Sequence, residues 1–519
     1  MSAAKSSQGS VVESIQESAN LEIIADSGDE IYQRKATVLN EAMQAVGMGK
    51  YQWWLFVVTG FGWFADNLWP IVTSLILAPV IQEFQFEAPY LKLGQNVGLL
   101  VGAIFWSLGA DVWGRRFSFN ITFFIIGAFA LAAGGAQNDI TLISLIACWS
   151  VGVGGNLPVD SAIFLEGVPA SHQYLLTVLS IWWSLGQLVG SLIAWPLIGN
   201  SKFSCEVDQV PCLRKDNWGW RYFLFLMGGL MIVLWAARFF LFTLHESPKY
   251  LMGRGRDADA VRVLHEIARY NGKEGALTLS EEDLTSISNT PGDAPEASMD
   301  TSALGAVRRK VARFRMGHIK SLFATRKLAY STTLVIILWA LIGLAFPLYN
   351  SFVTYYLATR GADFGDGSVY ITYRNQVILS VIGVPGAIVA GYLVELPSLG
   401  RRGTLSISTI LTGVFLFAST TARSSPALLG WNCAYSFTSN IMYGVLYAFT
   451  PEVFPTKARG TGNGLAAAAN RVFGIMAPII ALYGDLTTSV PIFVSGALFL
   501  AAGVIALLLP YESRGKAAL

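Results

Sequence analysis

The sequence is poor in charged residues and in the side chains that most often carry out catalysis. Only 13% of its 519 residues are charged, and only four are histidine. None of the histidines falls at metal-ligand spacing, and no glycine-rich loop ends in the Lys-Ser/Thr pair that holds nucleotide phosphates. We therefore expect no enzyme active site, no metal, no cofactor and no use of ATP.

The sequence is rich in apolar residues instead. They make up 53% of the chain, a share that a water-soluble protein of this length would hardly tolerate. A helix that crosses a bilayer needs about 20 mostly apolar residues, and by that measure the sequence predicts an integral membrane protein with twelve spans. The spans lie near residues 53–80, 93–112, 117–136, 140–168, 174–198, 219–244, 329–358, 370–395, 404–421, 427–452, 463–484 and 489–510.

The long loop between the sixth and seventh spans predicts the orientation of the chain. Its basic clusters contain Arg308, Arg309, Lys310, Arg313, Arg315, Arg326 and Lys327. Basic loops stay in the cytosol, and an even number of spans places both termini on that same side. We expect a cytosolic tail with an amphipathic helix, a first bundle, a central loop, a second bundle and a short tail. Their bounds are 1–50, 51–244, 245–327, 328–510 and 511–519.

Two cytosolic stretches outside the spans show helical periodicity. In the N-terminal tail, the apolar positions that share one helical face are Ile31, Val38, Leu39, Met43 and Val46. We expect this helix to lie along the membrane surface. In the central loop, the same pattern appears with Val261, Leu264 and Ile267 on one side, and we expect a short cytosolic helix followed by a flexible tether.

Four cysteines divide into two groups. Cys148 and Cys433 lie within spans, where they are simplest to interpret as small apolar residues. Cys205 and Cys212 share one predicted exterior loop, where oxidising conditions favour a disulfide between them. Two free thiols in a mobile loop remain the alternative.

The two sets of six spans carry an internal repeat. The stretch "GAIFWSLGADVWGRR" from Gly102 aligns with "GAIVAGYLVELPSLGRR" from Gly386 after a two-residue insertion. The register matches Asp111 with Glu395, Arg115 and Arg116 with Arg401 and Arg402, Glu166 with Glu452, Asp66 with Asn350, and Gln187 with Arg471. Two similar halves predict a transporter whose substrate site lies between them near the midplane.

Two aspartates lie inside predicted spans. An ionised carboxylate in hydrocarbon costs about 2.5–3.5 kcal/mol even on a lenient scale, so each must face protein or water. Asp66 lies 13 residues into its span, about 20 Å deep in a helix, and Asp160 follows the loosened stretch "VGVGGNLP". Desolvation favours the protonated acid, so either could couple transport to a proton gradient. A permanently hydrogen-bonded structural acid is the alternative for each.

Arg471 is the cation that we expect to accompany these acids. It lies in "AANRVFG" of the eleventh span, where it could bind an anionic group of the substrate or one of the aspartates. A static salt bridge to Asp160 or Glu452 is the alternative. Neutral hydrogen bonds to a substrate could come from Gln187, Asn350, Asn440, Tyr443 and Tyr447.

Several motifs resemble those of a known family. "ADVWGRR" and "HESPKYL" resemble signature loops of the major facilitator superfamily, while "GVGGNLPVDSAIFLEGVP" and "YAFTPEVFPTKARGTGNG" resemble its metabolite:proton symporter and synaptic-vesicle-protein-like branch, close to the sugar porters. The resemblance implies an all-α membrane fold of twelve helices in two pseudo-symmetric six-helix bundles. Two departures stand out: Ser107 replaces the usual first glycine of the loop motif, and "IGLAFPLYNSFVTYY" lacks the doubled glutamine of sugar porters.

Charges cluster at the cytosolic ends of the spans in both halves. Charge-assisted hydrogen bonds among them can tie helix ends together and hold the inner gate shut, and the resemblance implies networks that break when the gate opens. The alternative is a set of ordinary interfacial charges that fix topology. The candidate gating residues are Asp111, Arg115, Arg116, Glu166, Glu395, Arg401, Arg402, Glu452 and Arg459.

These features predict a secondary transporter that moves a small polar metabolite by alternating access. We expect an organic anion such as a carboxylate, in symport with protons, because an intramembrane arginine accompanies two acids and the sugar-type glutamines are absent. A sugar or polyol porter, a metabolite exporter and a sensor that binds without transporting remain alternatives. We expect a monomer in the plasma membrane that interacts with its substrate, protons and lipid, and not with nucleic acid.

Overall fold

The structure is a computed structural model, and the part of the chain that it describes consists of helices and connecting loops without strands. The described residues are 34–172, 175–206, 209, 211–241, 243–277, 279–288, 322–364, 368–394, 396, 398–454, 459–484 and 488–510. The predicted positions Ile31 and Glu395 and the basic cluster of residues 308–315 lie outside them.

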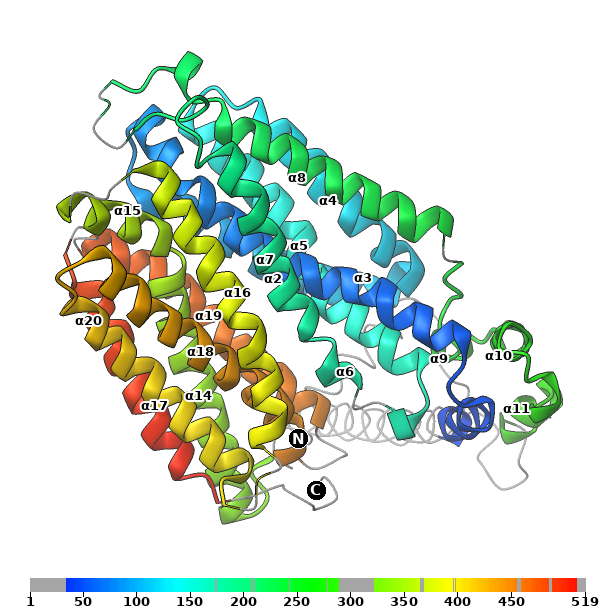
Figure 1. Ribbon diagram of the computed structural model, residues 1–519. Coiled ribbons are helices and arrows are strands. Elements are labelled where there is room, and N and C mark those ends of the chain that lie inside the picture. The colour runs from blue at the N-terminus through cyan, green and yellow to red at the C-terminus, as the bar shows by residue number, and fades with distance from the viewer. Residues whose placement is uncertain are drawn as a thin grey trace, which may run out of the picture.

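Twelve long helices cross the molecule, six in each half (Figure 1), which confirms the predicted fold class. The first half contains α2 (Lys50–Phe84), α3 (Ala88–Trp113), α4 (Arg115–Gly134), α5 (Asp139–Gly167), α7 (Ile181–Leu197) and α8 (Gly219–Ala236). The second half contains α14 (Arg326–Asn350), α16 (Val369–Leu393), α17 (Gly400–Thr420), α18 (Ser425–Val453), α19 (Arg459–Tyr483) and α20 (Val490–Leu507). Nine helices of the described part are long and apolar enough to cross a membrane by length and composition, and α3, α7 and α18 complete the twelve.

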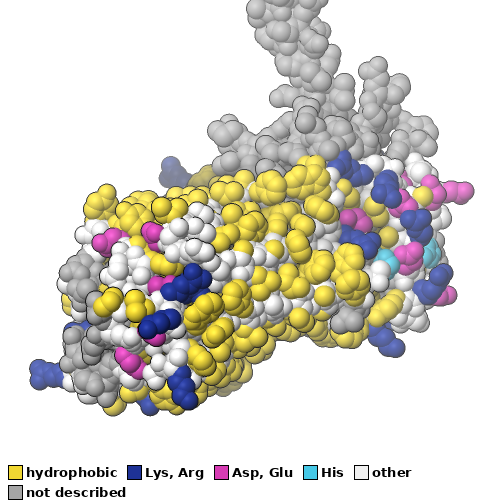
Figure 2. Space-filling view, turned by 90° about the horizontal axis from the view of Figure 1, so that it is seen from above, with side chains coloured by type: hydrophobic (Ala, Val, Ile, Leu, Met, Phe, Trp, Pro, Cys, Tyr) yellow, Lys and Arg dark blue, Asp and Glu magenta, His cyan; other side chains and the backbone are white. Residues whose placement is uncertain are grey.

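Shorter elements connect or flank these helices. They are η1 (Ala170–His172), α6 (Leu175–Val178), η2 (Arg214–Asp216), η3 (Ala237–Leu241), α9 (Pro248–Gly253), α10 (Asp257–Tyr270), η4 (Glu274–Ala276), α11 (Glu281–Ser288) and α15 (Val353–Asp363). Figure 2 shows a broad belt of hydrophobic side chains along the molecule, with charged side chains gathered at its two ends. This distribution suits a protein whose middle faces lipid tails.

The helices of the two halves pack in the same pattern, as the sequence repeat predicts. α3 packs on α5 as α16 packs on α18, α4 packs on α5 and α8 as α17 packs on α18 and α20, and α2 packs on α7 as α14 packs on α19. The halves meet through α7 with α16 and through α3 with α19, which are again equivalent pairs. The cavity described below therefore lies at a pseudo-twofold axis.

Glycine allows the closest of these helix contacts. A side chain at Gly102 would collide with the carbonyl oxygen of Val151, and one at Gly154 would collide with that of Leu99. The two glycines thus let the backbones of α3 and α5 approach each other directly. Small residues at helix interfaces favour packing in membranes, where no hydrophobic force drives helices together.

The two ends of the molecule differ in their connections. At one end, here called the disulfide end, Cys205 and Cys212 are bonded and their Cα atoms lie 5.9 Å apart. The opposite end, here called the loop end, carries α9 to α11 and the starts of α2 and α14. The predicted cytosolic side corresponds to the loop end.

Hydrogen bonds join the two halves at the disulfide end. Thr354 Oγ1 donates to the carbonyl oxygen of Ser74 at 2.5 Å, and Ser74 Oγ donates to that of Asn350 at 3.3 Å. The hydroxyl of Tyr373 donates to the Leu75 carbonyl. These contacts close the disulfide end in this structure.

The N-terminal helix packs against protein at the loop end. Residues 34–46 are helical, and Leu39, Met43 and Val46 are buried in one cluster with residues of α10. Lys35 Nζ lies 2.5 Å from a carboxylate oxygen of Asp257 on that helix. The expectation that the helix lies along the membrane surface is therefore wrong for its apolar face, because the facing apolar stripe of α10 covers it.

Candidate functional site

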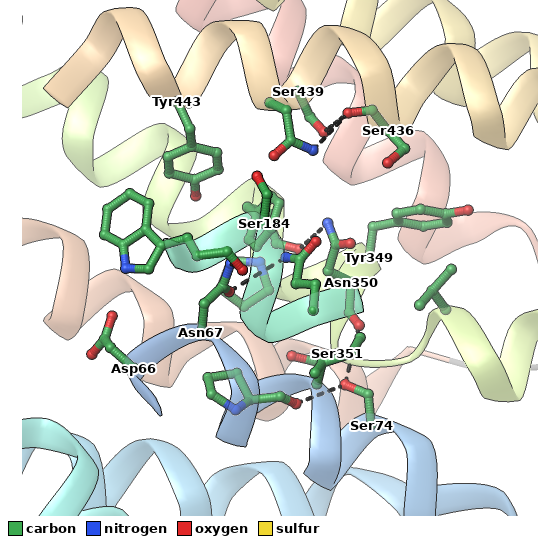
Figure 3. Close-up of a pocket in the computed structure, with 18 of the residues that line it drawn as sticks. Asp66, Asn67, Ser74, Ser184, Tyr349, Asn350, Ser351, Ser436, Ser439 and Tyr443 are labelled. Carbon is green, nitrogen blue, oxygen red and sulfur yellow. Dashed lines mark hydrogen bonds between the residues drawn. The ribbon is translucent and has the colours of Figure 1, made fainter. Parts of the chain in front are cut away.

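A cavity of about 220 Å³ lies between the two halves. Helices α2, α3 and α7 line it from the first half, and α14, α16, α18 and α19 line it from the second. Figure 3 shows Asp66 and Asn67 on one side of the cavity, with Ser436, Ser439 and Tyr443 on the opposite side. The position between the repeats matches the predicted location of the substrate site.

An ion pair joins the halves at the wall of this cavity. Arg471 Nη2 of α19 lies 3.4 Å from Asp66 Oδ1 of α2. The side chains retain 25% and 12% of their accessible surface, respectively, so both can meet water or a ligand. Asp66 lies one turn before Pro70, and proline has no N–H to bond the Asp66 carbonyl. The helix is thus locally polar where the acid stands.

Lys92 is a further charged residue of the cavity, and the sequence analysis did not single it out. It lies on α3 and is 1% exposed. Its Nζ donates to the carbonyl oxygen of Pro70 at 2.8 Å and to Gln95 Oε1 at 3.1 Å. The predicted span began at residue 93, so this lysine looked like an interfacial residue rather than an intramembrane one.

The five neutral residues predicted to bind substrate all line the cavity: Gln187, Asn350, Asn440, Tyr443 and Tyr447. Gln187 Nε2 donates to Asn67 Oδ1 at 3.3 Å, and the amide of Asn350 donates to the Tyr435 hydroxyl. Asn440 Nδ2 donates to the carbonyl oxygen of Ser436 at 2.9 Å. Their partners belong to the cavity wall, so these amides are held in place before any ligand arrives.

Aromatic rings form one part of the wall. The ring centroids of Trp183 and Tyr447 lie 4.5 Å apart, and those of Phe346 and Tyr443 lie 4.8 Å apart. All four residues line the cavity. Edge-to-face contacts of this kind stabilise the wall, and they leave flat surfaces against which a planar ligand can pack.

Asp160 does not line the cavity. It is fully buried, and its Oδ2 lies 2.5 Å from Arg238 Nη2 of the same half. The guanidinium also donates to the carbonyl oxygens of Phe119 and Val58. Glycine at position 62 leaves the space that the Asp160 carboxylate occupies. The structure therefore separates Asp160 from Arg471, and Arg238 is the partner that sequence reasoning missed because it lies near the end of a span.

Arginine and glutamate pair at equivalent positions of the two halves at the loop end. Arg115 donates to both carboxylate oxygens of Glu166, at 3.1 and 3.2 Å. Arg401 Nε lies 2.8 Å from Glu452 Oε2. Each pair joins helices of one half.

The other candidate gating residues surround these pairs. The backbone nitrogens of Arg115 and Arg116 donate to the carboxylate of Glu246, at 2.9 and 3.3 Å, and Arg402 follows Arg401 at the start of α17. Burial raises the pKa of Glu246, and these backbone donors partly oppose that shift. The side chains of Asp111 and Arg459 lie outside the described part, as does Glu395.

Comparisons with known proteins agree with this architecture. Residues 95–512 match the family described as sugar (and other) transporter. "MFS siderochrome iron transporter 1" of Ceriporiopsis subvermispora is 61% identical over 495 residues, covering 95% of this chain and 93% of the relative. The niacin transporter NiaP of Acinetobacter baylyi is 26% identical over 441 residues, covering 83% of this chain and 87% of the relative.

Among solved structures, the partially occluded inward open conformation of the xylose transporter XylE from E. coli has the same fold. It matches with a TM-score of 0.63 at 15% sequence identity, over 89% of this chain and 100% of that chain. With the family match and the close relative, the chain belongs to the sugar (and other) transporter family and is a membrane transporter of the major facilitator superfamily, close to the sugar porters.

Proposed function

We propose that the protein carries a small organic anion, a carboxylate, together with protons by alternating access. The ion pair between Asp66 and Arg471 is the observation that carries this proposal, because it joins the two halves at the cavity wall. An ionisable pair in that position can sense both a proton and an anion. Its members belong to different halves, so breaking it also loosens the contact between them.

The pair provides a mechanism for coupling. A proton on Asp66 removes the charge that holds Arg471, and the guanidinium then needs another anion. A substrate carboxylate can take that place with two parallel hydrogen bonds. Proton and anion thus load together, and departure of the anion restores the pair as the proton leaves. Asp66 carries the proton in this proposal because, unlike Asp160, it lines the cavity.

The charge of the cavity supports an anionic substrate. Asp66, Lys92 and Arg471 are the charged side chains that line it within the described part. Two positive groups and one negative group leave an excess of positive charge when all are ionised. The excess grows when Asp66 takes up a proton, which is the state that loads substrate.

Closure of the disulfide end indicates a state whose cavity communicates with the loop end. In the opposite state we expect the loop-end charges to meet across the halves. The pairs of Arg115 with Glu166 and of Arg401 with Glu452 would then belong to a larger gate. Asp111, Arg116, Glu395, Arg402 and Arg459 keep their predicted places in it. We place the protein as a monomer in the plasma membrane, with both termini and the loop end in the cytosol.

An iron siderochrome is the second candidate cargo, because the relative at 61% identity is named for it. A chelate that surrounds a metal ion with its own oxygen ligands is much larger than a single-ring acid. The cavity of about 220 Å³ is small even for drug-sized ligands, whose pockets measure about 300–1,000 Å³. Size therefore favours the small acid in this state.

Uptake into proteoliposomes tests the proposal. The purified protein is reconstituted, a gradient of about one pH unit is imposed with acid outside, and uptake of labelled nicotinate, xylose and an iron-loaded hydroxamate siderochrome is compared. With one-to-one coupling we expect about tenfold accumulation of nicotinate, and loss of that uptake in Arg471→Gln. Selective accumulation of xylose or of the siderochrome would refute the carboxylate. Uptake of none, with binding retained, would favour a sensor.

A further inference from the structure

Lys92 is a buried lysine whose described partners are both neutral. The Pro70 carbonyl and the Gln95 side-chain oxygen take two of its N–H groups, while the other two charged groups of the cavity face each other. A buried ammonium without a counter-ion is costly. An anionic ligand would relieve this cost, so the position is suited to a second recognition point in the cavity.

Gln95 adds a donor beside this lysine. Its Oε1 must face Lys92, because the reverse orientation would set two donors against each other. Its Nε2 is therefore turned away from the lysine, and this atom is buried without a hydrogen-bond partner. Gln95 is 2% exposed and lines the cavity. A buried donor left unsatisfied costs about 1–3 kcal/mol, which a ligand acceptor would recover.

The two side chains make a group that can only donate. The oxygen of Gln95 is occupied by Lys92, and an ammonium has no acceptor. Such a group binds a carboxylate, a carbonyl or an aromatic ring nitrogen. It gives no partner to a lone N–H, and this distinguishes it from the hydroxyl-rich wall around Ser74 and Ser380.

The donor group lies close to the pair of Asp66 and Arg471. Lys92 contacts the carbonyl of Pro70, which is four residues beyond Asp66 on α2, or about 6 Å along a helix. A single-ring acid spans such a distance. We propose that Lys92 and Gln95 form a second subsite, so that the transported acid carries a second acceptor, either another carboxylate or a ring nitrogen. The inference rests on the proposed function, which supplies Arg471 as the first anchor.

Three acids that share one ring and differ in the second acceptor test this subsite. Benzoate has none, nicotinate has a ring nitrogen, and isophthalate has a second carboxylate. Binding of each is measured by competition against labelled nicotinate on the full-length protein, on Lys92→Met and on Lys215→Met. Lys215 is exposed at the disulfide end and serves as the charge-matched control.

We expect the unmodified protein and Lys215→Met to prefer nicotinate and isophthalate over benzoate by about tenfold or more, the effect of one hydrogen bond to a charged group. Lys92→Met should bind all three acids equally, at the affinity of benzoate. Acids that bind through Arg471 but keep their preference in Lys92→Met would overturn the subsite and leave the proposed function intact. Failure of every acid to bind the unmodified protein would overturn both.

A second variant decides the matter if Lys92→Met does not fold. Gln95→Glu has nearly the same shape, but its carboxylate pairs with Lys92 and removes the donor. The preference for two acceptors should disappear, while benzoate still binds. A preference that survives in Gln95→Glu would count against the subsite as strongly as one that survives in Lys92→Met.

Discussion

Two pairs of aspartate and arginine lie inside the membrane-spanning part of the molecule, and their surroundings differ. Asp160 and Arg238 belong to one half, approach to 2.5 Å and are fully buried. Asp66 and Arg471 belong to different halves, approach to 3.4 Å and remain partly exposed in a cavity. The same two residue types can thus fasten one bundle internally or form a contact that must open during each transport cycle.

The surroundings of the arginines explain the difference. The Arg238 guanidinium lies 3.8 Å from the ring centroids of Phe119 and Phe123 and donates to two backbone carbonyls besides Asp160. Moving it would break every one of these contacts. The printed hydrogen bond of Arg471 is the single long contact with Asp66, so a proton or a competing anion can replace it at small cost.

Breaking the sealed pair should have the largest effect on stability. Removing one member of a buried pair leaves the other charged and without its partner, which costs about 3–5 kcal/mol. We therefore expect Arg238→Met to lower the unfolding temperature sharply in detergent, as measured by tryptophan fluorescence. Arg471→Met is the matched control and should unfold close to the unmodified protein. Equal losses in the two variants would contradict the distinction between the pairs.

Breaking the cavity pair should affect coupling more than stability. Asp66→Asn keeps the side-chain shape but cannot exchange a proton, so the about tenfold accumulation expected from one pH unit should vanish. Exchange of labelled for unlabelled acid at equal pH should persist, because Arg471 is still present to bind the anion. Proton-driven accumulation and counterflow are measured in the same proteoliposomes. Accumulation that survives in Asp66→Asn but fails in a folded Asp160→Asn would reverse the assignment of the two pairs.

The sequence could predict the spans, the repeat and the intramembrane acids, because the length of apolar runs and the rarity of charge are direct consequences of the bilayer. It could not predict which acid meets the cavity. In a membrane both the lipid-facing and the protein-facing sides of a helix are apolar, so periodicity does not separate the face of Asp66 from that of Asp160. Arg238 and Lys92 escaped notice because each lies near a predicted span boundary, where basic residues normally reach the headgroups.

A third acid and base pair, at the water-exposed loop end, extends the comparison and should have the smallest effect. His245 Nδ1 lies 3.2 Å from Glu266 Oε2. Burial lowers the pKa of His245 below its ordinary value, Glu266 partly opposes this shift, and Arg116 adds to it. The unfolded chain therefore binds the proton more readily. The stability that the neutral imidazole contributes is complete above about pH 6.5 and is lost as the pH falls toward the lowered pKa of the folded state.

We expect His245→Gln to flatten this part of the pH dependence, with a difference of no more than about 2 °C in unfolding temperature between neutral and mildly acidic buffer. The measurement is a thermal scan of both proteins across that range. Glu246 has a raised pKa and an opposite pH dependence, but it is present in both proteins and cancels in their difference. His172→Gln is the control and should keep the slope of the unmodified protein. If His245→Gln keeps it as well, the loop-end pair has no part in the response to acid. Any pH dependence of transport would then have to come from the groups within the membrane.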